Sequence, residues 1–70
     1  MDITESLTEF ERGVLYAAYL ICELHDNPTV AGDVLREANL VSADIRQLDN
    51  TEYRVLQKLN ASEHLTLKVK

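Results

Sequence analysis

Residues 8–25 read TEFERGVLYAAYLICELH, and this stretch decides the fold. Its apolar residues recur with the 3.6-residue period of an α-helix. Thr8 and Glu11 form the capping-box pattern that starts a helix. Asn27-Pro28 ends it, because a residue before proline is pushed out of the helical region. We therefore predict a helix over about residues 8–25, about 27 Å long at ~1.5 Å per residue.

The apolar face of this helix is unusually wide. On a helical wheel it covers an arc of roughly 220°, about twice what a surface helix needs. Two explanations stay open: the helix lies at the centre of a bundle, or one edge of the arc remains exposed. We favour the second and predict that Leu15, Tyr16 and Tyr19 contact a partner, since tyrosines supply a large apolar area with a polar tip.

Gly13 and Ala17 lie one turn apart on this helix and form a shallow groove. A glycine inside a helix costs about 1 kcal/mol relative to alanine, so Gly13 requires a reason. Close packing of the next helix of the chain would supply that reason. The seam of a homodimer would supply another.

Three further helices are predicted from the rest of the chain. The first covers about residues 29–38 and stops at Asn39, a residue that tolerates the left-handed conformation. The second is short, over about residues 43–48. The third covers about residues 50–60 and has Asp49 as its cap. Apolar periodicity places four residues of these last two helices in the core: Ile45, Leu48, Leu56 and Leu59.

The end of the chain changes period and predicts a strand over about residues 64–69. Leu65, Leu67 and Val69 lie on one side of it, and the chain offers no obvious partner strand. Such a strand frays, packs its apolar side on the helices, or pairs with another chain. We predict that these three residues bind a second copy or a partner's sheet edge, through main-chain hydrogen bonds.

Seventy residues bound the molecule to one small domain, residues 1–70. The predicted fold is all-α, a small bundle of three to four short helices with a short C-terminal β-strand. The single cysteine, Cys22, excludes an intrachain disulfide, and the sequence has no Cys/His cluster with metal-ligand spacing. No serine or cysteine has a nucleophile context, and there is no Gly-rich phosphate loop. We predict no enzyme activity, no catalytic residues, no metal and no cofactor.

Two features bear on location. Residues 1–6 are polar and acidic, unlike a signal peptide. The longest apolar run, Val14–Cys22, has nine residues. Crossing a bilayer takes about 20. We expect a soluble, cytoplasmic protein without a membrane partner.

Charge is distributed unevenly along the chain. Residues 1–35 contain seven acids and one base, whereas residues 36–70 contain five acids and six bases. The acidic half disfavours nucleic acid and anionic membranes. An alternative function is a helix-turn-helix DNA-binding regulator of transcription, because residues 30–48 predict a helix, a turn at residues 39–41 and a second short helix, although Leu35 stands where that motif prefers a small residue. In that alternative, DNA contacts would come from Arg36, Arg46, Gln47, Arg54 and Lys58, with Arg46 and Gln47 in the major groove.

Three segments carry a resemblance to a known group of proteins. They are EFERGVLYAAYLI (9–21), PTVAGDVLREANL (28–40) and DIRQLDNTEYRVL (44–56). In style and segment order they resemble the small accessory proteins encoded by tailed phages and prophages of enteric bacteria. The resemblance implies binding and redirection or inhibition of a host protein in the cytoplasm of an infected bacterium, with no catalytic residues to carry over. The leading prediction is therefore an acidic protein-binding accessory factor that acts on a host protein and self-associates as a homodimer.

Overall fold

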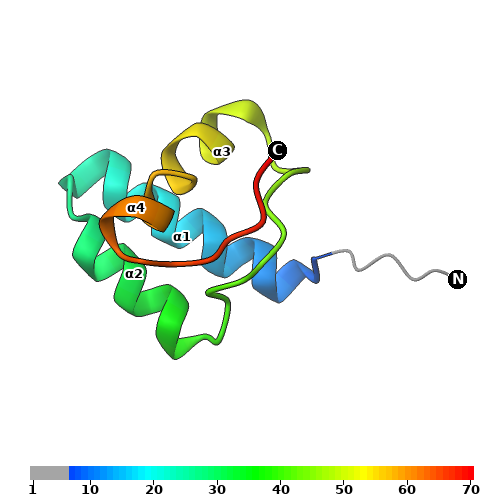
Figure 1. The fold of residues 1–70 in the computed structure, drawn as a ribbon, viewed down its shortest axis with the longest axis horizontal. Helices are drawn as coiled ribbons and strands as arrows, with labels where there is room; N and C mark the ends of the chain where they lie inside the picture. The colour runs from blue at the N-terminus through cyan, green and yellow to red at the C-terminus, as the bar shows by residue number, and fades with distance from the viewer. Residues whose placement is uncertain (1–6) are drawn as a thin grey trace, which may run out of the picture.

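The computed structural model describes residues 7–70, which form a mostly helical fold around one hydrophobic core. The helices of this part of the chain, labelled in Figure 1, are α1 (Glu9–His25), α2 (Pro28–Glu37), α3 (Asn50–Leu56) and the single-turn α4 (Leu59–Ser62). The prediction of a mostly helical fold is confirmed. The signal-peptide comparison concerned residues 1–6, which lie outside the described residues.

Helix α1 begins and ends where the sequence predicts. The Glu11 N–H donates to Thr8 Oγ1 at 3.1 Å, and the Thr8 N–H donates to Glu11 Oε1 at 2.9 Å, which completes the capping box. Glu9 in the same turn places a further negative charge at the positive end of the helix dipole. The helix ends at Asp26, whose backbone is left-handed (φ 48°) and whose N–H donates to the Cys22 carbonyl.

Helix α2 follows almost at once. Asn27 caps its first turn through its side-chain oxygen, and Pro28 occupies the first helical position. After its last turn Asn39 adopts the left-handed conformation (φ 60°), and the Leu40 N–H folds back to the Leu35 carbonyl at 2.8 Å. The predicted helix is confirmed to within one residue at each end.

The helix predicted over about residues 50–60 is interrupted. Asp49 caps α3 by accepting the N–H groups of the first turn. The chain then turns at Gln57 and Lys58, and α4 continues in a new direction. Hydrogen bonds between residues three positions apart, such as that from the Lys58 N–H to the Val55 carbonyl, replace the four-residue spacing of an α-helix there.

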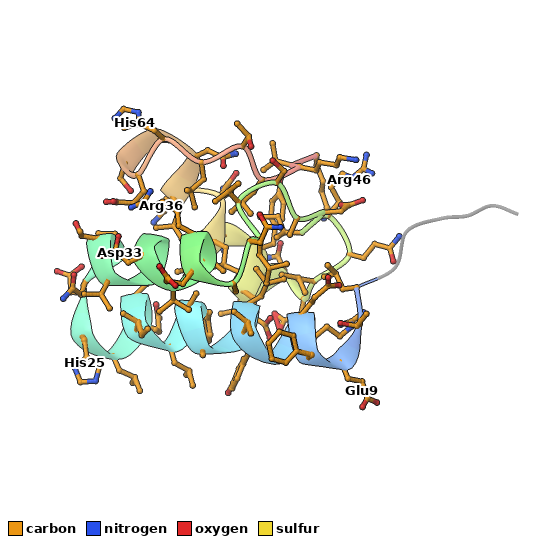
Figure 2. All side chains as sticks on the ribbon, turned by 90° about the horizontal axis from the view of Figure 1, so that it is seen from below. Glu9, His25, Asp33, Arg36, Arg46 and His64 are labelled. Carbon is orange, nitrogen blue, oxygen red and sulfur yellow. The ribbon has the colours of Figure 1, made fainter. Side chains whose placement is uncertain are left out.

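Helix α1 is the longest element, and the rest of the fold packs on one side of it. Both α2 and α3 contact α1, and α4 contacts α2 and α3. Seen from a perpendicular direction, α1 forms one edge of the molecule and the C-terminal segment lies at the opposite edge (Figure 2). The core consists of buried apolar residues from every part of the described chain: Leu15, Ala18, Ala31, Leu35, Leu40, Ile45, Leu48, Tyr53, Leu56, Leu59, Leu65 and Leu67.

Two predicted elements are wrong. Residues 43–48 form turns and an extended stretch, not a helix, although Ile45 and Leu48 are buried as predicted. Residues 64–69 form no strand: His64 is left-handed (φ 58°), and the segment makes one isolated parallel bridge, between Lys68 and Asp44. The two errors have one origin, because the two segments pair with each other.

The C-terminal segment runs parallel to residues 41–45. Three backbone hydrogen bonds join them: Thr66 N–H to Val41 O at 3.0 Å, Lys68 N–H to Ala43 O at 2.9 Å, and Ile45 N–H to Lys68 O at 3.2 Å. A regular parallel ladder would add a bond from the Ala43 N–H to the Thr66 carbonyl. The Ala43 N–H instead donates to the Leu40 carbonyl in the turn after α2. The ladder therefore stops at one bridge.

Asn60 completes the attachment of the C-terminal segment. Its Nδ2 donates to the Leu67 carbonyl at 3.0 Å, and its Oδ1 accepts from the Leu67 N–H at 2.8 Å. One side chain thus supplies both partners that a neighbouring strand would otherwise provide. Leu65 and Leu67, on the inward side of the segment, are buried in the core.

Replacing Asn60 with alanine removes both bonds and leaves two partly buried backbone groups without a partner. We expect the free energy of unfolding, measured by urea denaturation, to fall by about 1–3 kcal/mol. Gln57→Ala, at a nearby exposed position, is the matched control and should change stability by less than ~0.5 kcal/mol. Equal stability of the two variants would show that Asn60 does not hold the segment.

Candidate protein-binding site

Three of the six residues predicted to bind a partner belong to the core. Leu15, Leu65 and Leu67 are all buried. The expectation that Leu15 lies on an exposed edge of α1 is wrong, because the side of α1 that faces the core is centred near Leu15 and Ala18. Of the three alternatives for the C-terminal segment, packing its apolar side on the helices is the one observed.

The main chain of the C-terminal segment is also engaged. The N–H groups of Thr66, Leu67, Lys68 and Lys70 all donate within the chain, the last to Tyr53 Oη at 2.8 Å. Pairing of this segment with a second copy or with a sheet edge would require these bonds to break. Of the three apolar residues predicted to bind from this segment, Val69 is the exposed one, at 39%.

The two predicted tyrosines lie together at the border of the exposed side of α1. Tyr16 is 48% exposed, whereas Tyr19 is partly buried against the core, and their ring centroids are 5.7 Å apart. Desolvation raises the pKa of Tyr19, and the negative charge of Glu23 acts in the same direction. The Tyr19 hydroxyl is therefore protonated and neutral at physiological pH.

The most exposed apolar residues lie elsewhere on α1. Phe10 is 72% exposed and Leu24 is 69% exposed. Between them lie Gly13 and Ala17, both exposed, and Leu20, half-buried. The alternating spacings of three and four residues keep these positions on one face of a helix. We call the five residues the outer face of α1. Figure 2 shows α1 along one edge of the molecule, with no other described element beyond it.

Gly13 shows that this face is open. A Cβ atom built on Gly13 has no atom within 4 Å outside its own helical neighbourhood. Packing of α2 is therefore the wrong explanation for this glycine. Gly32 differs, because its Cβ would lie 3.0 Å from Glu63 Cγ, so Gly32 does serve the contact between α2 and the end of α4.

Arg46 and Gln47, the residues predicted to enter the DNA major groove, do not lie on a recognition helix. The predicted helix over residues 43–48 is absent, and both residues lie in a turn. The Arg46 guanidinium donates to both carboxylate oxygens of Asp44, at 2.9 and 2.7 Å. These hydrogen bonds lower the pKa of Asp44 to about 2. The pair fastens the turn beside the C-terminal segment.

The other basic residues of the DNA-binding alternative are dispersed. Arg36 bonds to Asp33 and to the carbonyl of Glu63, and so joins α2 to the end of α4. Arg54 lies on α3, and Lys58 lies at the turn before α4. The described residues therefore present these five side chains from separate elements and not from one helix.

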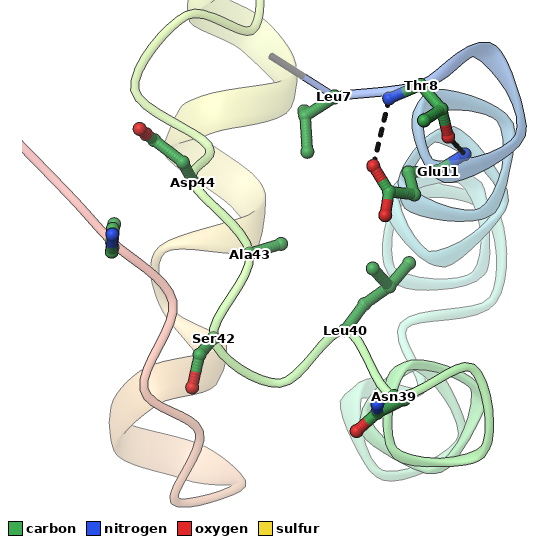
Figure 3. Close-up of a pocket in the computed structure, with 9 residues that line it drawn as sticks. Leu7, Thr8, Glu11, Asn39, Leu40, Ser42, Ala43 and Asp44 are labelled. Carbon is green, nitrogen blue, oxygen red and sulfur yellow. Dashed lines mark hydrogen bonds between the residues drawn. The ribbon is translucent and has the colours of Figure 1, made fainter. Parts of the chain in front are cut away.

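A hollow of about 440 Å³ lies between the first turn of α1, the loop after α2 and the C-terminal segment (Figure 3). Several of its polar groups already have partners: Thr8 and Glu11 bond to each other, and Asp44 bonds to Arg46. A binding site for a small molecule needs a few polar groups free to converge on it. These groups serve the fold instead.

Three further observations concern metal binding, the reactivity of Cys22 and the membrane. Among residues 7–70, no three His, Cys, Asp or Glu side chains gather closely enough to hold a metal ion. Cys22 is partly buried, and burial raises the pKa of its thiol, which lowers the thiolate fraction at neutral pH. None of the helices in the described part of the chain has the length and apolar content needed to span a bilayer.

A scan against protein-family models found no match for the chain, and searches of curated proteins and of solved structures found none either.

Replacing Gly13 with alanine tests whether anything in the chain covers the outer face of α1. Alanine has the better helix propensity and meets no atom there, so the free energy of unfolding should rise by about 0.5–1 kcal/mol in urea denaturation. Gly32→Ala is the matched control and should bring no gain, because the Glu63 side chain must shift. A loss of stability in Gly13→Ala would mean that the chain itself covers this face.

Proposed function

We propose that this chain is a non-enzymatic accessory factor that binds another protein through the outer face of α1. The observation that carries the proposal is the exposure of Phe10 and Leu24 on one face of the longest helix. Large apolar side chains exposed on a continuous face are typical of protein-binding surfaces. Tyr16 borders this face and adds an aromatic ring with a polar tip.

The binding energy of such a site comes from burial of its apolar residues. Full burial of an exposed Phe or Leu side chain contributes about 1.5–3 kcal/mol. Phe10 and Leu24 stand about 21 Å apart along the helix, so a partner must lie along α1 to bury both. The caps and the core hold α1 in place, so the surface is formed before binding and little ordering is needed.

The resemblance to phage accessory proteins supports a host protein as the partner. In this proposal the chain occupies part of that protein's surface and thereby modulates or inhibits it. Occupancy requires no chemical step by the chain itself.

The double substitution Phe10→Gln with Leu24→Gln tests the proposal. Because both residues are exposed, we expect the free energy of unfolding to change by less than ~1 kcal/mol. Retention of the partner by the immobilised chain in a bacterial lysate, followed by mass spectrometry, should be lost. Val69→Gln changes an exposed apolar residue outside α1 and is the matched control, which should retain the partner.

A host protein retained equally by the wild-type chain and the double variant would contradict the proposal. Loss of that protein with Val69→Gln alone would move the binding site to the C-terminal segment.

A further inference from the structure

We infer that the partner segment that fits the outer face of α1 is an amphipathic helix with Lys or Arg residues beside its apolar stripe. This inference rests on the proposed function, to which it adds the shape and the charge of the partner.

The geometry of the outer face points to a helix. Its five positions alternate by three and four residues, the spacing with which one helix packs lengthwise against another. Phe10 and Leu24 form the two ends of the stripe, and Gly13 and Ala17 form a notch between them. Small residues at the middle let a second helix approach closely, while the large side chains at the ends pack against it. A straight stripe of about four turns is matched by a partner helix of similar length.

The charge around the stripe points to a basic partner. Glu9 directly precedes Phe10, and Glu23 directly precedes Leu24. Both acids are exposed. Helix α1 as a whole contains three acids, Glu9, Glu11 and Glu23, and one Lys or Arg residue, Arg12. Oppositely charged groups at the rim of an interface speed association and select the correct partner.

A second copy of this chain fits the face less well. Packing two copies through α1 would bring Glu9 and Glu23 of each into one interface, and both acidic halves would meet. Like charges across an interface oppose association. The two occupants also respond oppositely to salt: screening weakens attraction to a basic helix and relieves repulsion between two acidic copies.

The experiment uses two helical peptides of about 20 residues with the same leucine stripe, one flanked by lysines and one by glutamates. Binding to the full chain is followed by fluorescence anisotropy. At about 50 mM salt the lysine peptide should bind at least about tenfold tighter than the glutamate peptide, and the difference should shrink at about 500 mM. Phe10→Gln with Leu24→Gln preserves the charge of the chain and should weaken the lysine peptide about tenfold or more.

Two further variants separate charge from shape. Glu9→Gln with Glu23→Gln should weaken the lysine peptide at low salt and reduce its salt dependence. Gly13→Ala, which fills the notch without disturbing the fold, should weaken the lysine peptide several-fold. Val69→Gln should leave its affinity unchanged.

Equal affinity for the two peptides, or no binding of either at high micromolar concentration, would overturn the inference. So would sedimentation showing that the chain dimerises as salt is added and that Phe10→Gln with Leu24→Gln abolishes the dimer, since the occupant would then be a second copy. The peptide results by themselves do not contradict the proposed function, which fails if the double variant still retains the host protein or if Val69→Gln alone loses it.

Discussion

The attachment of the C-terminal segment to residues 41–45 and to Asn60 is the interaction on which the rest of the structure depends. Three backbone hydrogen bonds and two bonds from one amide side chain keep Leu65 and Leu67 in the core. The segment completes the core at the edge of the molecule opposite α1 (Figure 2). No element between residues 7 and 70 is then left to cover the outer face of α1.

The parts of the fold that local signals determine could be predicted from the sequence. The Thr8 cap, the Asn27-Pro28 break and the Asn39 stop each act over a few residues, and each lies where the sequence places it. Residues 41–45 and the C-terminal segment lie more than twenty positions apart, and their pairing leaves no local signal. Ile45 and Leu48 are three residues apart, a spacing that a helix and a turn can both bury, so the prediction of burial was right while the predicted helix was wrong.

The exposed face of α1 could not be identified from the sequence, for a different reason. A helical wheel identifies which residues of α1 are apolar, but not which of them faces the core. Leu15 and Leu24 are nine residues apart, which is about 180° around a helix, so they cannot both face the same neighbour. The positions of α2 and α3 decide that Leu15 is buried and Leu24 exposed. An arc of roughly 220° fits a central helix as well as a helix with one exposed edge, so the arc alone could not decide between them.

The C-terminal segment belongs to the chain's own core, and we propose that the outer face of α1 is left for a partner. Amide hydrogen exchange of the free chain, followed residue by residue by NMR, tests this most directly. The account predicts that the Ile45, Thr66, Leu67 and Lys68 amides are protected as strongly as those at the centre of α1, because they open only when the core opens. Exchange of the C-terminal amides at the rate of an unstructured peptide would contradict it, because that segment would then be free to pair with another chain.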